Sequence, residues 1–132
     1  MKPYIKKILL TTILCVYCTT FINTVQAQSE KADLKEYAEY VADYYNLDDT
    51  FIRTIKCESN FDPDAAHPVS SAYGIAQFLD GSWIWFADMY QKDKGVELSR
   101  IIPKDSIRLM GWAFNHGYQN HWSCYKKIKS TK

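Results

Sequence analysis

The sequence predicts an all-α, mainly helical fold in a single compact domain. Apolar residues recur at helical spacing in several segments, whereas no segment alternates convincingly between apolar and polar residues over four or more positions. The 132 residues give room for one domain, since domains hold roughly 100–200 residues each. An apolar share of 47% excludes a disordered chain, and 23% charged residues exclude a multi-span membrane protein.

Residues 1–27 have the pattern of a secretory signal peptide. Three lysines lie within the first seven residues, the 15-residue stretch Ile8–Ile22 carries no charge, and Val25–Ala27 offers small residues to a signal peptidase. A transmembrane helix needs about 20 apolar residues, so the stretch is short, and an uncleaved anchor is the alternative. We therefore expect export to the periplasm, cell wall or extracellular space, with a mature domain at residues 28–132.

Signal cleavage would leave 105 residues with a net charge of −2. The full chain has a net charge of +1, and cleavage removes three lysines and no acidic residue. Such a charge balance creates no strong positive field that would attract the phosphates of nucleic acid, so we expect no nucleic-acid partner. The mature chain keeps Cys57 and Cys124, and an even number of cysteines in an exported protein predicts a disulfide. The alternative is a zinc site that these cysteines form with His116 and His121, which the exported context disfavours.

The first two helices of the mature chain follow from periodicity and capping. Lys31–Asn46 places its apolar side chains at the spacing of one buried helical face, namely Leu34, Tyr37, Ala38, Val41, Tyr44 and Tyr45. Asp48 or Asp49 can cap a second helix at Phe51–Glu58. Asn60–Pro63 ends this helix, because the residue before a proline avoids helical geometry.

The remaining elements are shorter. Gly74–Leu79 is predicted to be a short helix, and Asp80–Ser82 a turn and cap before a helix at Trp83–Gln91. After a polar loop, Pro103 suits the first turn of another helix. Trp122–Ile128 is predicted to add a last turn or two.

Glu58 is the candidate general acid. It ends an apolar helix beside Cys57, with Thr54, Ile55 and Phe61 close in sequence. Partly apolar surroundings disfavour the charged carboxylate and should raise its pKa, which suits a general acid near neutral pH. Taken alone, a glutamate in the last turn of a helix is more often a solvated charge.

Three blocks strengthen this interpretation: Glu58–Pro63, Ala72–Gln77 and Ala113–Gly117. The matching residues of the first two blocks are Glu58, Ser59, Phe61, Asp62, Pro63, Ala72, Gly74, Ile75 and Gln77. Together the blocks closely resemble the catalytic signature of SLT-type lytic transglycosylases, the lysozyme-like enzymes that cut bacterial peptidoglycan. The third block is similar to the Ala-Tyr-Asn-Ala-Gly motif of that family. Trp122–Cys124 resembles small exported members that pair a cysteine before the glutamate with one after a late tryptophan.

The resemblance implies a compact lysozyme-like domain with a glycan groove, one disulfide and no metal or cofactor. Glu58 would protonate the glycosidic oxygen between N-acetylmuramic acid and N-acetylglucosamine, then act as base toward the C6 hydroxyl of the muramic residue. The product would be a 1,6-anhydro end. Most glycosidases need two carboxylates, but here the acetamido group of the substrate can replace the second. Asp62, Asp64 and Asp80 are the candidates for a second carboxylate, and none is obviously placed for it.

Further site residues carry over from the resemblance by position. Gln77 would hydrogen-bond the sugar, Asn115 and the backbone around Gly74 would shape the groove, and Ser59 would either support the glutamate or bond the backbone. Aromatic candidates for stacking on sugars are Tyr73, Trp83, Trp85, Phe114 and Tyr118. Core packing is the alternative for aromatic residues, and it is favoured for Trp85, Phe86 and Trp112.

Three other functions remain open at this stage. A goose-type-like lysozyme would hydrolyse the same bond with water, a non-catalytic glycan-binding or secretion accessory protein could share the scaffold, and a small exported protein could bind another partner. The presence of Glu58 argues against a pure binder. The expected partner is the peptidoglycan glycan strand, with a secretion or conjugation apparatus as a further candidate. We expect a monomer without stable membrane insertion after signal cleavage.

Overall fold

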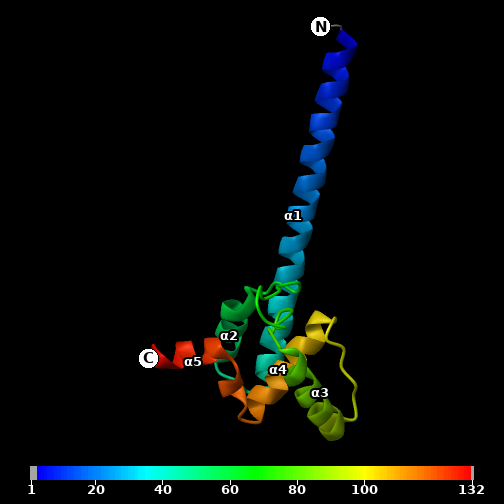
Figure 1. The fold of residues 1–132 in the computed structure, drawn as a ribbon. Coiled ribbons are helices and arrows are strands. Elements are labelled where there is room, and N and C mark those ends of the chain that lie inside the picture. Colours follow the sequence, from blue (N-terminus) through cyan, green and yellow to red (C-terminus); the bar gives the residue numbers. More distant parts are fainter. Residues whose placement is uncertain (1–2, 132) are drawn as a thin grey trace. The chain divides into compact units, whose positions relative to one another are not determined.

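The computed structural model describes residues 3–131, with side chains described from Val16 onward. Helices hold 68% of the chain and the described part contains no strand, which confirms the predicted all-α class. The helices in chain order are α1 (Pro3–Tyr45), α2 (Thr50–Ser59), α3 (Asp80–Lys94), α4 (Pro103–Asn115), the short 3₁₀ helix η1 (Gln119–His121) and α5 (Ser123–Ser130) (Figure 1).

The chain consists of two units, Met1–Ala32 and Asp33–Lys132. Helix α1 contains residues of both, so the predicted helix start at Lys31 is wrong. No proline or glycine lies between Tyr4 and Tyr45 to interrupt it. Of the lysines at the start of the predicted signal peptide, Lys2 lies outside the described residues. None of the helices in the described part combines the length and apolar character that a membrane span requires.

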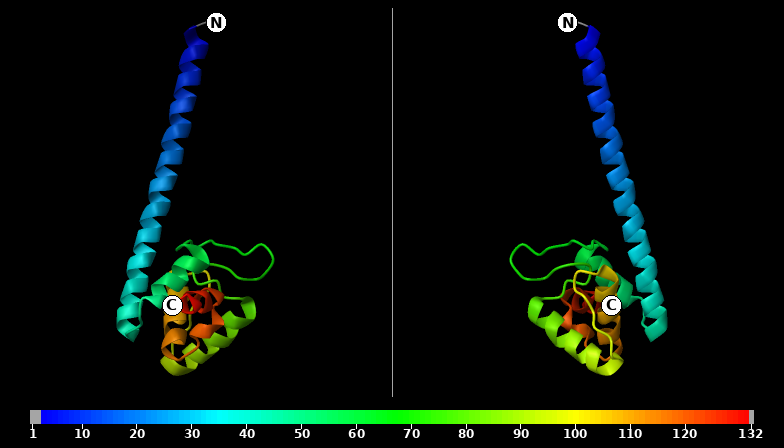
Figure 2. Two further views of the ribbon diagram at one scale, coloured as in Figure 1. Left: turned by 90° about the vertical axis from the view of Figure 1, so that its left-hand side faces the viewer. Right: turned by 90° about the vertical axis from the view of Figure 1, so that its right-hand side faces the viewer.

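The second unit is built around one hydrophobic core. Within it, α2 packs against α5 and α3 against α4 (Figure 2). The most deeply buried large side chains come from α2, α3, α4 and the loop before α3, namely Phe51, Ile55, Ile75, Phe78, Phe86, Ile107, Leu109 and Met110. The predicted face of α1 joins them through Leu34, Ala38 and Val41, whereas Tyr44 of the same prediction is 67% exposed.

Helix α2 ends in two consecutive residues with left-handed backbone. Asn60 has φ 52° and Phe61 has φ 59°, and the Asn60 N–H closes the helix by donating to the Lys56 carbonyl at 2.9 Å. The left-handed region costs roughly 1–2 kcal/mol for a residue other than glycine, less for asparagine. Phe61 adopts it with its side chain buried. The predicted helix end is confirmed, and this left-handed turn begins ahead of Pro63.

The predicted short helix at Gly74–Leu79 is wrong. The segment is a turn flanked by isolated β-bridges that both involve Tyr73. Gly74 has φ 75° and Gln77 has φ 51°, and a right-handed helix cannot contain residues in that conformation. The turn therefore depends on two left-handed backbone angles, which cannot be predicted from the spacing of apolar residues.

Helix α3 begins at Asp80 rather than at the predicted Trp83, because distant side chains complete its first turn. The Asp80 N–H donates to Ser71 Oγ at 3.1 Å, and the Asp80 carboxylate pairs with Arg100 at the positive end of the helix dipole. Arg100 Nη2 also donates to the carbonyls of Ser71 at 2.7 Å and Phe78 at 2.5 Å. Arg100 thus fastens the preceding loop to the start of α3.

Gly111 of α4 marks a close approach between α4 and α1. A Cβ at this position would lie 2.3 Å from Val41 Cγ1. We expect Gly111→Ala to lower the free energy of unfolding by about 1–3 kcal/mol, because an added methyl group strains a packed core. Urea unfolding measures the effect. Gly81→Ala in α3 is the control, since no atom lies within 4 Å of the place that its added methyl group would occupy; equal unfolding of the two variants would contradict the close packing.

Candidate active site

Glu58 opens into a pocket of about 280 Å³ in the second unit. Its walls come from the end of α2, from the loop between α2 and α3, and from the residues around the start of α5. The lining residues are Glu58, His67, Ser70, Ala72, Gln77, Leu79, His121, Trp122 and Ser123. The pocket therefore joins two of the three sequence blocks to the segment that carries Cys124.

The Glu58 side chain is half-buried at the C-terminal end of α2. Burial raises the pKa of its carboxyl above the ordinary value, while a hydrogen bond from the Cys124 N–H and the charge of Lys127 act in the opposite direction. The Cys124 N–H donates to Oε1 at 3.1 Å. The net raised pKa has the direction that the sequence predicts, and it favours a carboxyl that can hold a proton for transfer.

The predicted disulfide between Cys57 and Cys124 is confirmed. The S–S distance is 2.02 Å and the two Cα atoms are 5.9 Å apart. The bond joins α2 to α5 and keeps the Cys124 N–H beside Glu58. It also occupies both sulfurs that the alternative zinc site would need. Within the described residues, no group of three or more His, Cys, Asp and Glu side chains is arranged to hold a metal ion.

Three side chains hold the loop carbonyls of residues 74–76 in place. Gln77 Nε2 donates to the Gly74 and Ala65 carbonyls, both at 2.8 Å. Ser59 Oγ donates to the Ile75 carbonyl at 2.7 Å, and Trp122 Nε1 donates to the Ala76 carbonyl at 2.8 Å. Ser59 thus has the backbone-bonding role, outside the pocket lining. Gln77 lines the pocket with its amide nitrogen engaged, and its Oε1 is the atom that can accept from a sugar.

The third sequence block lies outside this pocket. Phe114, predicted to stack on a sugar, is buried and packs against Phe51, Trp122 and Tyr125, with ring centroids 5.2–5.5 Å away. The side chain therefore packs in the core and lines another pocket, next to Tyr125, instead of the pocket of Glu58. Its predicted role in stacking on a sugar stays a prediction. Asn115 is exposed at the end of α4 and does not line the pocket.

Some of the other aromatic side chains predicted for the site or the core lie in the core, and others are exposed. Tyr73 is 37% exposed, and its hydroxyl donates to Asp64 at 3.2 Å outside the pocket lining. Trp83 is buried, which corrects its predicted stacking role, whereas Phe86 and Trp112 lie in the core as favoured. Trp85 is 49% exposed, so core packing is wrong for it; its ring meets Tyr118 edge-on at 5.5 Å, and neither lines the pocket.

Sequence reasoning did not place the two histidines of the pocket, His67 and His121, among its site residues, and it weighed His121 only as a zinc ligand. His121 Nε2 lies 2.8 Å from Ser82 Oγ, and its ring packs edge-on against Phe86 at 5.2 Å. The sequence feature that could have placed His121 in the pocket is its position directly before the Trp122–Cys124 motif. His116, the remaining histidine of the mature chain, stacks on Trp112 and does not line the pocket.

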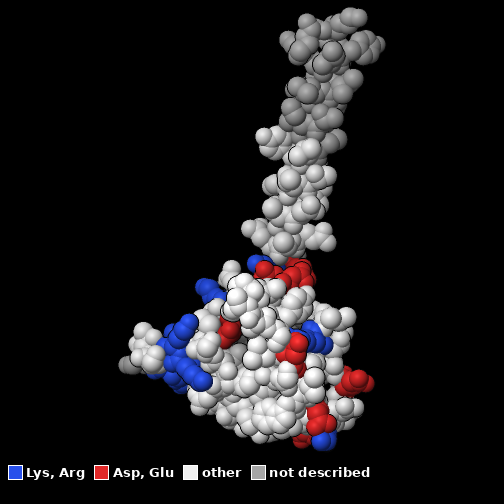
Figure 3. All heavy atoms as spheres, in the orientation of Figure 1, with Lys and Arg blue, Asp and Glu red and all other residues white. Residues whose placement is uncertain are grey.

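The candidate second carboxylates point to other partners. Asp62 Oδ1 accepts from the Asp64 N–H at 3.1 Å, Asp64 accepts from the Tyr73 hydroxyl, and Asp80 pairs with Arg100. None of them lines the pocket, so Glu58 is the single carboxylate among its described lining residues. Basic residues of α5 act on the pocket instead: burial raises the pKa of Glu58 while the charge of Lys127 opposes this rise, and burial together with the charge of Lys126 lowers the pKa of His121. Figure 3 shows basic side chains gathered toward the C-terminus, where α5 carries its lysines.

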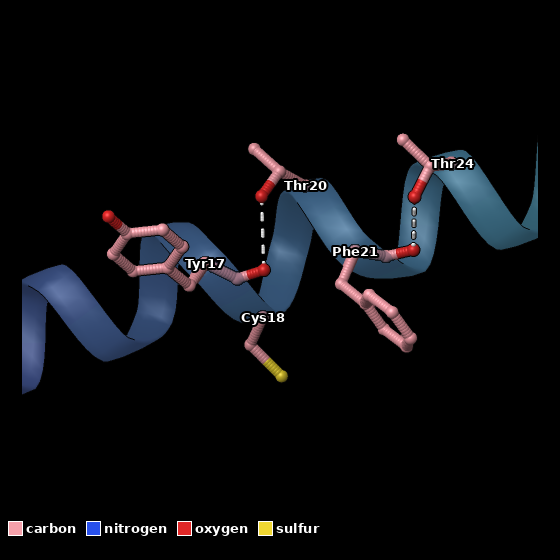
Figure 4. Close-up of a pocket in the computed structure, with 5 residues that line it drawn as sticks. All are labelled: Tyr17, Cys18, Thr20, Phe21 and Thr24. Atoms are coloured by element: carbon pink, nitrogen blue, oxygen red, sulfur yellow. Dashed lines mark hydrogen bonds between the residues drawn. The ribbon is translucent and has the colours of Figure 1, made fainter.

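A further hollow, of about 600 Å³, lies along the predicted signal segment in the first unit. Figure 4 shows its lining side chains on one helix, namely Tyr17, Cys18, Thr20, Phe21 and Thr24. The two threonine hydroxyls donate back to helix carbonyls at 3.0 and 2.8 Å. Its described lining residues include no carboxyl or imidazole, the usual side chains of acid–base chemistry.

Comparisons of the chain with protein-family models, curated proteins and solved structures found no match. A functional assignment therefore depends on the pocket around Glu58 and on the sequence blocks that build it.

Proposed function

We propose that the chain is a peptidoglycan lytic transglycosylase that cleaves the β-1,4 bond between N-acetylmuramic acid and N-acetylglucosamine. The observation that carries the proposal is the placement of Glu58. It is a half-buried carboxyl with a raised pKa, and it is the single carboxylate among the described residues of its pocket. The sequence blocks supply the substrate class, and the single carboxylate supports a mechanism that needs only one.

In the first step the protonated Glu58 carboxyl donates its proton to the glycosidic oxygen. The bond from that oxygen to C1 of the muramic residue breaks, and N-acetylglucosamine leaves with a free 4-hydroxyl. The acetamido carbonyl of the muramic residue donates electrons to C1 and takes the place of a second carboxylate. A half-buried acid suits this step, because burial raises its pKa and so favours the protonated form that donates.

In the second step the Glu58 carboxylate takes the proton of the C6 hydroxyl on the same muramic residue. The C6 oxygen bonds to C1, the acetamido oxygen is released, and the 1,6-anhydro ring closes. Glu58 is protonated again and ready for the next bond. The Cys124 N–H at 3.1 Å stabilises the carboxylate between the two steps, and Gln77 Oε1 can accept from a sugar hydroxyl or amide.

Product analysis tests the proposal. The oxidised protein, purified from an exporting host, is incubated with purified peptidoglycan, and mass spectrometry reads the sugar ends that it releases. We expect 1,6-anhydro ends that are absent with Glu58→Gln. Reducing ends instead would identify a hydrolysing lysozyme, and unchanged peptidoglycan would leave a glycan binder.

The raised pKa of Glu58 also predicts how stability depends on pH. The folded state holds this proton more tightly than the unfolded chain, so the free energy of unfolding falls as pH rises from about 4.5 through the raised pKa. Glutamine does not titrate, so Glu58→Gln should be more stable than the wild type above this window, and the advantage should vanish below it.

Thermal unfolding of both proteins between pH 4 and 8 checks this expectation. Glu97→Gln, which removes an exposed carboxyl, is the matched control. A stability difference for Glu58→Gln that stays constant across the pH range would show that burial does not penalise the Glu58 carboxylate.

A further inference from the structure

The second unit has another pocket, of about 250 Å³, lined by residues of α1, α3 and α4. Its lining residues are Tyr37, Tyr40, Val41, Tyr44, Tyr45, Tyr90, Lys94 and Arg108. We call it the tyrosine pocket. It shares no lining residue with the pocket of Glu58, and the proposed cleavage step uses none of its side chains.

Four of the tyrosines form a continuous row along α1. The ring centroids of Tyr37 and Tyr40 are 5.9 Å apart, those of Tyr40 and Tyr44 6.5 Å, and those of Tyr44 and Tyr45 4.8 Å. Tyr40 and Tyr44 are 61% and 67% exposed. Folding therefore leaves two large rings in water beside a concave site, where an apolar part of a ligand can cover them.

Two cations provide the charged part of the lining. Arg108 Nε and Nη2 donate to the Tyr37 hydroxyl at 3.2 and 3.0 Å, which holds the guanidinium beside the tyrosine row. Lys94 is the second cation. Each cation has an acid beside it that lies outside the lining: Asp93 Oδ2 is 3.2 Å from Lys94 Nζ, and Asp105 Oδ1 is 3.6 Å from Arg108 Nη1. Both acids also accept from a second donor, Asp93 from Trp112 Nε1 at 2.8 Å and Asp105 from the Ser99 N–H at 3.0 Å. A ligand carboxylate would therefore share Lys94 and Arg108 with these acids.

The tyrosine hydroxyls add hydrogen-bond donors. Burial raises the pKa of Tyr45 to about 12, with smaller contributions from neighbouring groups, and burial also raises the pKa of Tyr90. Both phenols therefore keep their protons at physiological pH. The pocket thus combines aromatic surface, neutral donors and two cations, which suits a ligand that carries both a carboxylate and apolar groups.

We propose that the tyrosine pocket binds the peptide stem of peptidoglycan through a stem carboxylate. The inference rests on the proposed function for the source of the ligand, because the stems are the carboxylate-bearing peptides of that polymer. Lys94 and Arg108 take the carboxylate, and the exposed rings of Tyr40 and Tyr44 cover the aliphatic part of the stem. The enzyme would then hold its substrate at a second place besides the glycan pocket.

Isothermal titration with the free stem peptide, released from purified peptidoglycan by an amidase, tests this site without occupying a glycan pocket. The protein is the full oxidised chain with Glu58→Gln. We expect Lys94→Gln to weaken binding about tenfold, the size of one charge-assisted hydrogen bond. The double variant Tyr40→Ser/Tyr44→Ser should weaken binding by about the same factor, because the aliphatic part of the stem loses the two rings that cover it. A stem peptide with amidated carboxylates should bind about tenfold more weakly as well.

Lys92→Gln is the matched control, because Lys92 is an exposed lysine of the same helix that pairs with Asp88 and does not line the pocket. It should bind the stem as the parent does. Equal affinity of Lys94→Gln and Lys92→Gln, equal affinity for the amidated stem, or no binding of the free stem would each overturn the inference.

Release of cleaved ends from whole peptidoglycan, measured separately on the wild type, keeps the two proposals apart. If the wild type cleaves peptidoglycan but the pocket variants bind the stem as well as the parent does, only the proposal for the tyrosine pocket is refuted. If the pocket variants weaken stem binding but the wild type releases no cleaved ends, only the transglycosylase proposal is refuted.

Discussion

Glu58→Gln is expected to slow the release of muropeptides from peptidoglycan by about 10²–10⁴-fold, the usual contribution of a general acid or base. Glutamine keeps the shape of the side chain, and its amide oxygen can still accept from the Cys124 N–H, but it has no acidic proton to donate. The loss should therefore reside in the turnover rate. Binding of an intact glycan strand should stay close to that of the wild type. The initial rate of soluble sugar release measures the effect.

Asp64→Asn is the matched control for this result. Asp64 lies outside the pocket, and asparagine can still accept from the Tyr73 hydroxyl that contacts it. We expect this variant to keep the wild-type rate. A comparable loss in both variants would point to a two-carboxylate hydrolase, and a full rate in Glu58→Gln would exclude Glu58 as the acid.

Replacing both disulfide cysteines by serine is expected to lower the free energy of unfolding by about 4 kcal/mol, because the bond closes a long loop of the unfolded chain. The bonded residues are 67 positions apart. Small domains have total stabilities of about 5–15 kcal/mol, so the loss takes a large share. Urea unfolding of the wild type and of the Cys57→Ser/Cys124→Ser variant measures it.

The same variant should also lose part of its activity under conditions where it remains folded, because α5 is no longer fastened beside Glu58. Lys126→Ala is the control, since Lys126 is an exposed residue of the same helix α5 and takes no part in the disulfide. It should unfold at the same urea concentration as the wild type. An unchanged urea midpoint in the double variant would contradict a stabilising role for the bond.

Elements with strong periodic patterns were predictable from the sequence, and elements fixed by distant contacts were not. Helix α2 was predicted within about a residue of each end, and α4 begins at Pro103 as predicted. The start of α3 depends on Arg100 and Ser71, which are far from it in sequence. The turn at residues 74–77 depends on left-handed backbone at a glutamine, a conformation that residue type rarely signals.

The candidate site shows the same division. Glu58 and Gln77 were found because they belong to compact motifs, and the two cysteines because their number is even. Phe114 was assigned to the site by motif, although the helical spacing that it shares with Ile107 and Met110 already places it on the buried face of α4. His121 and Trp122 form a wall of the pocket because folding brings the start of α5 against the end of α2, where the disulfide and the bond from Trp122 Nε1 to the Ala76 carbonyl hold it.

The left-handed pair that follows α2 also determines which sequences this site can tolerate. A β-branched residue is strongly disfavoured in that conformation, and glycine, asparagine and aspartate are preferred. At Asn60 we expect that narrow set of replacements to survive in a library of functional variants. At Phe61 the backbone favours glycine, but the buried ring favours a large apolar side chain, so few replacements satisfy both. Sequence diversity in the descendants of this protein should therefore fall sharply at two adjacent positions directly after the Glu58-Ser59 pair.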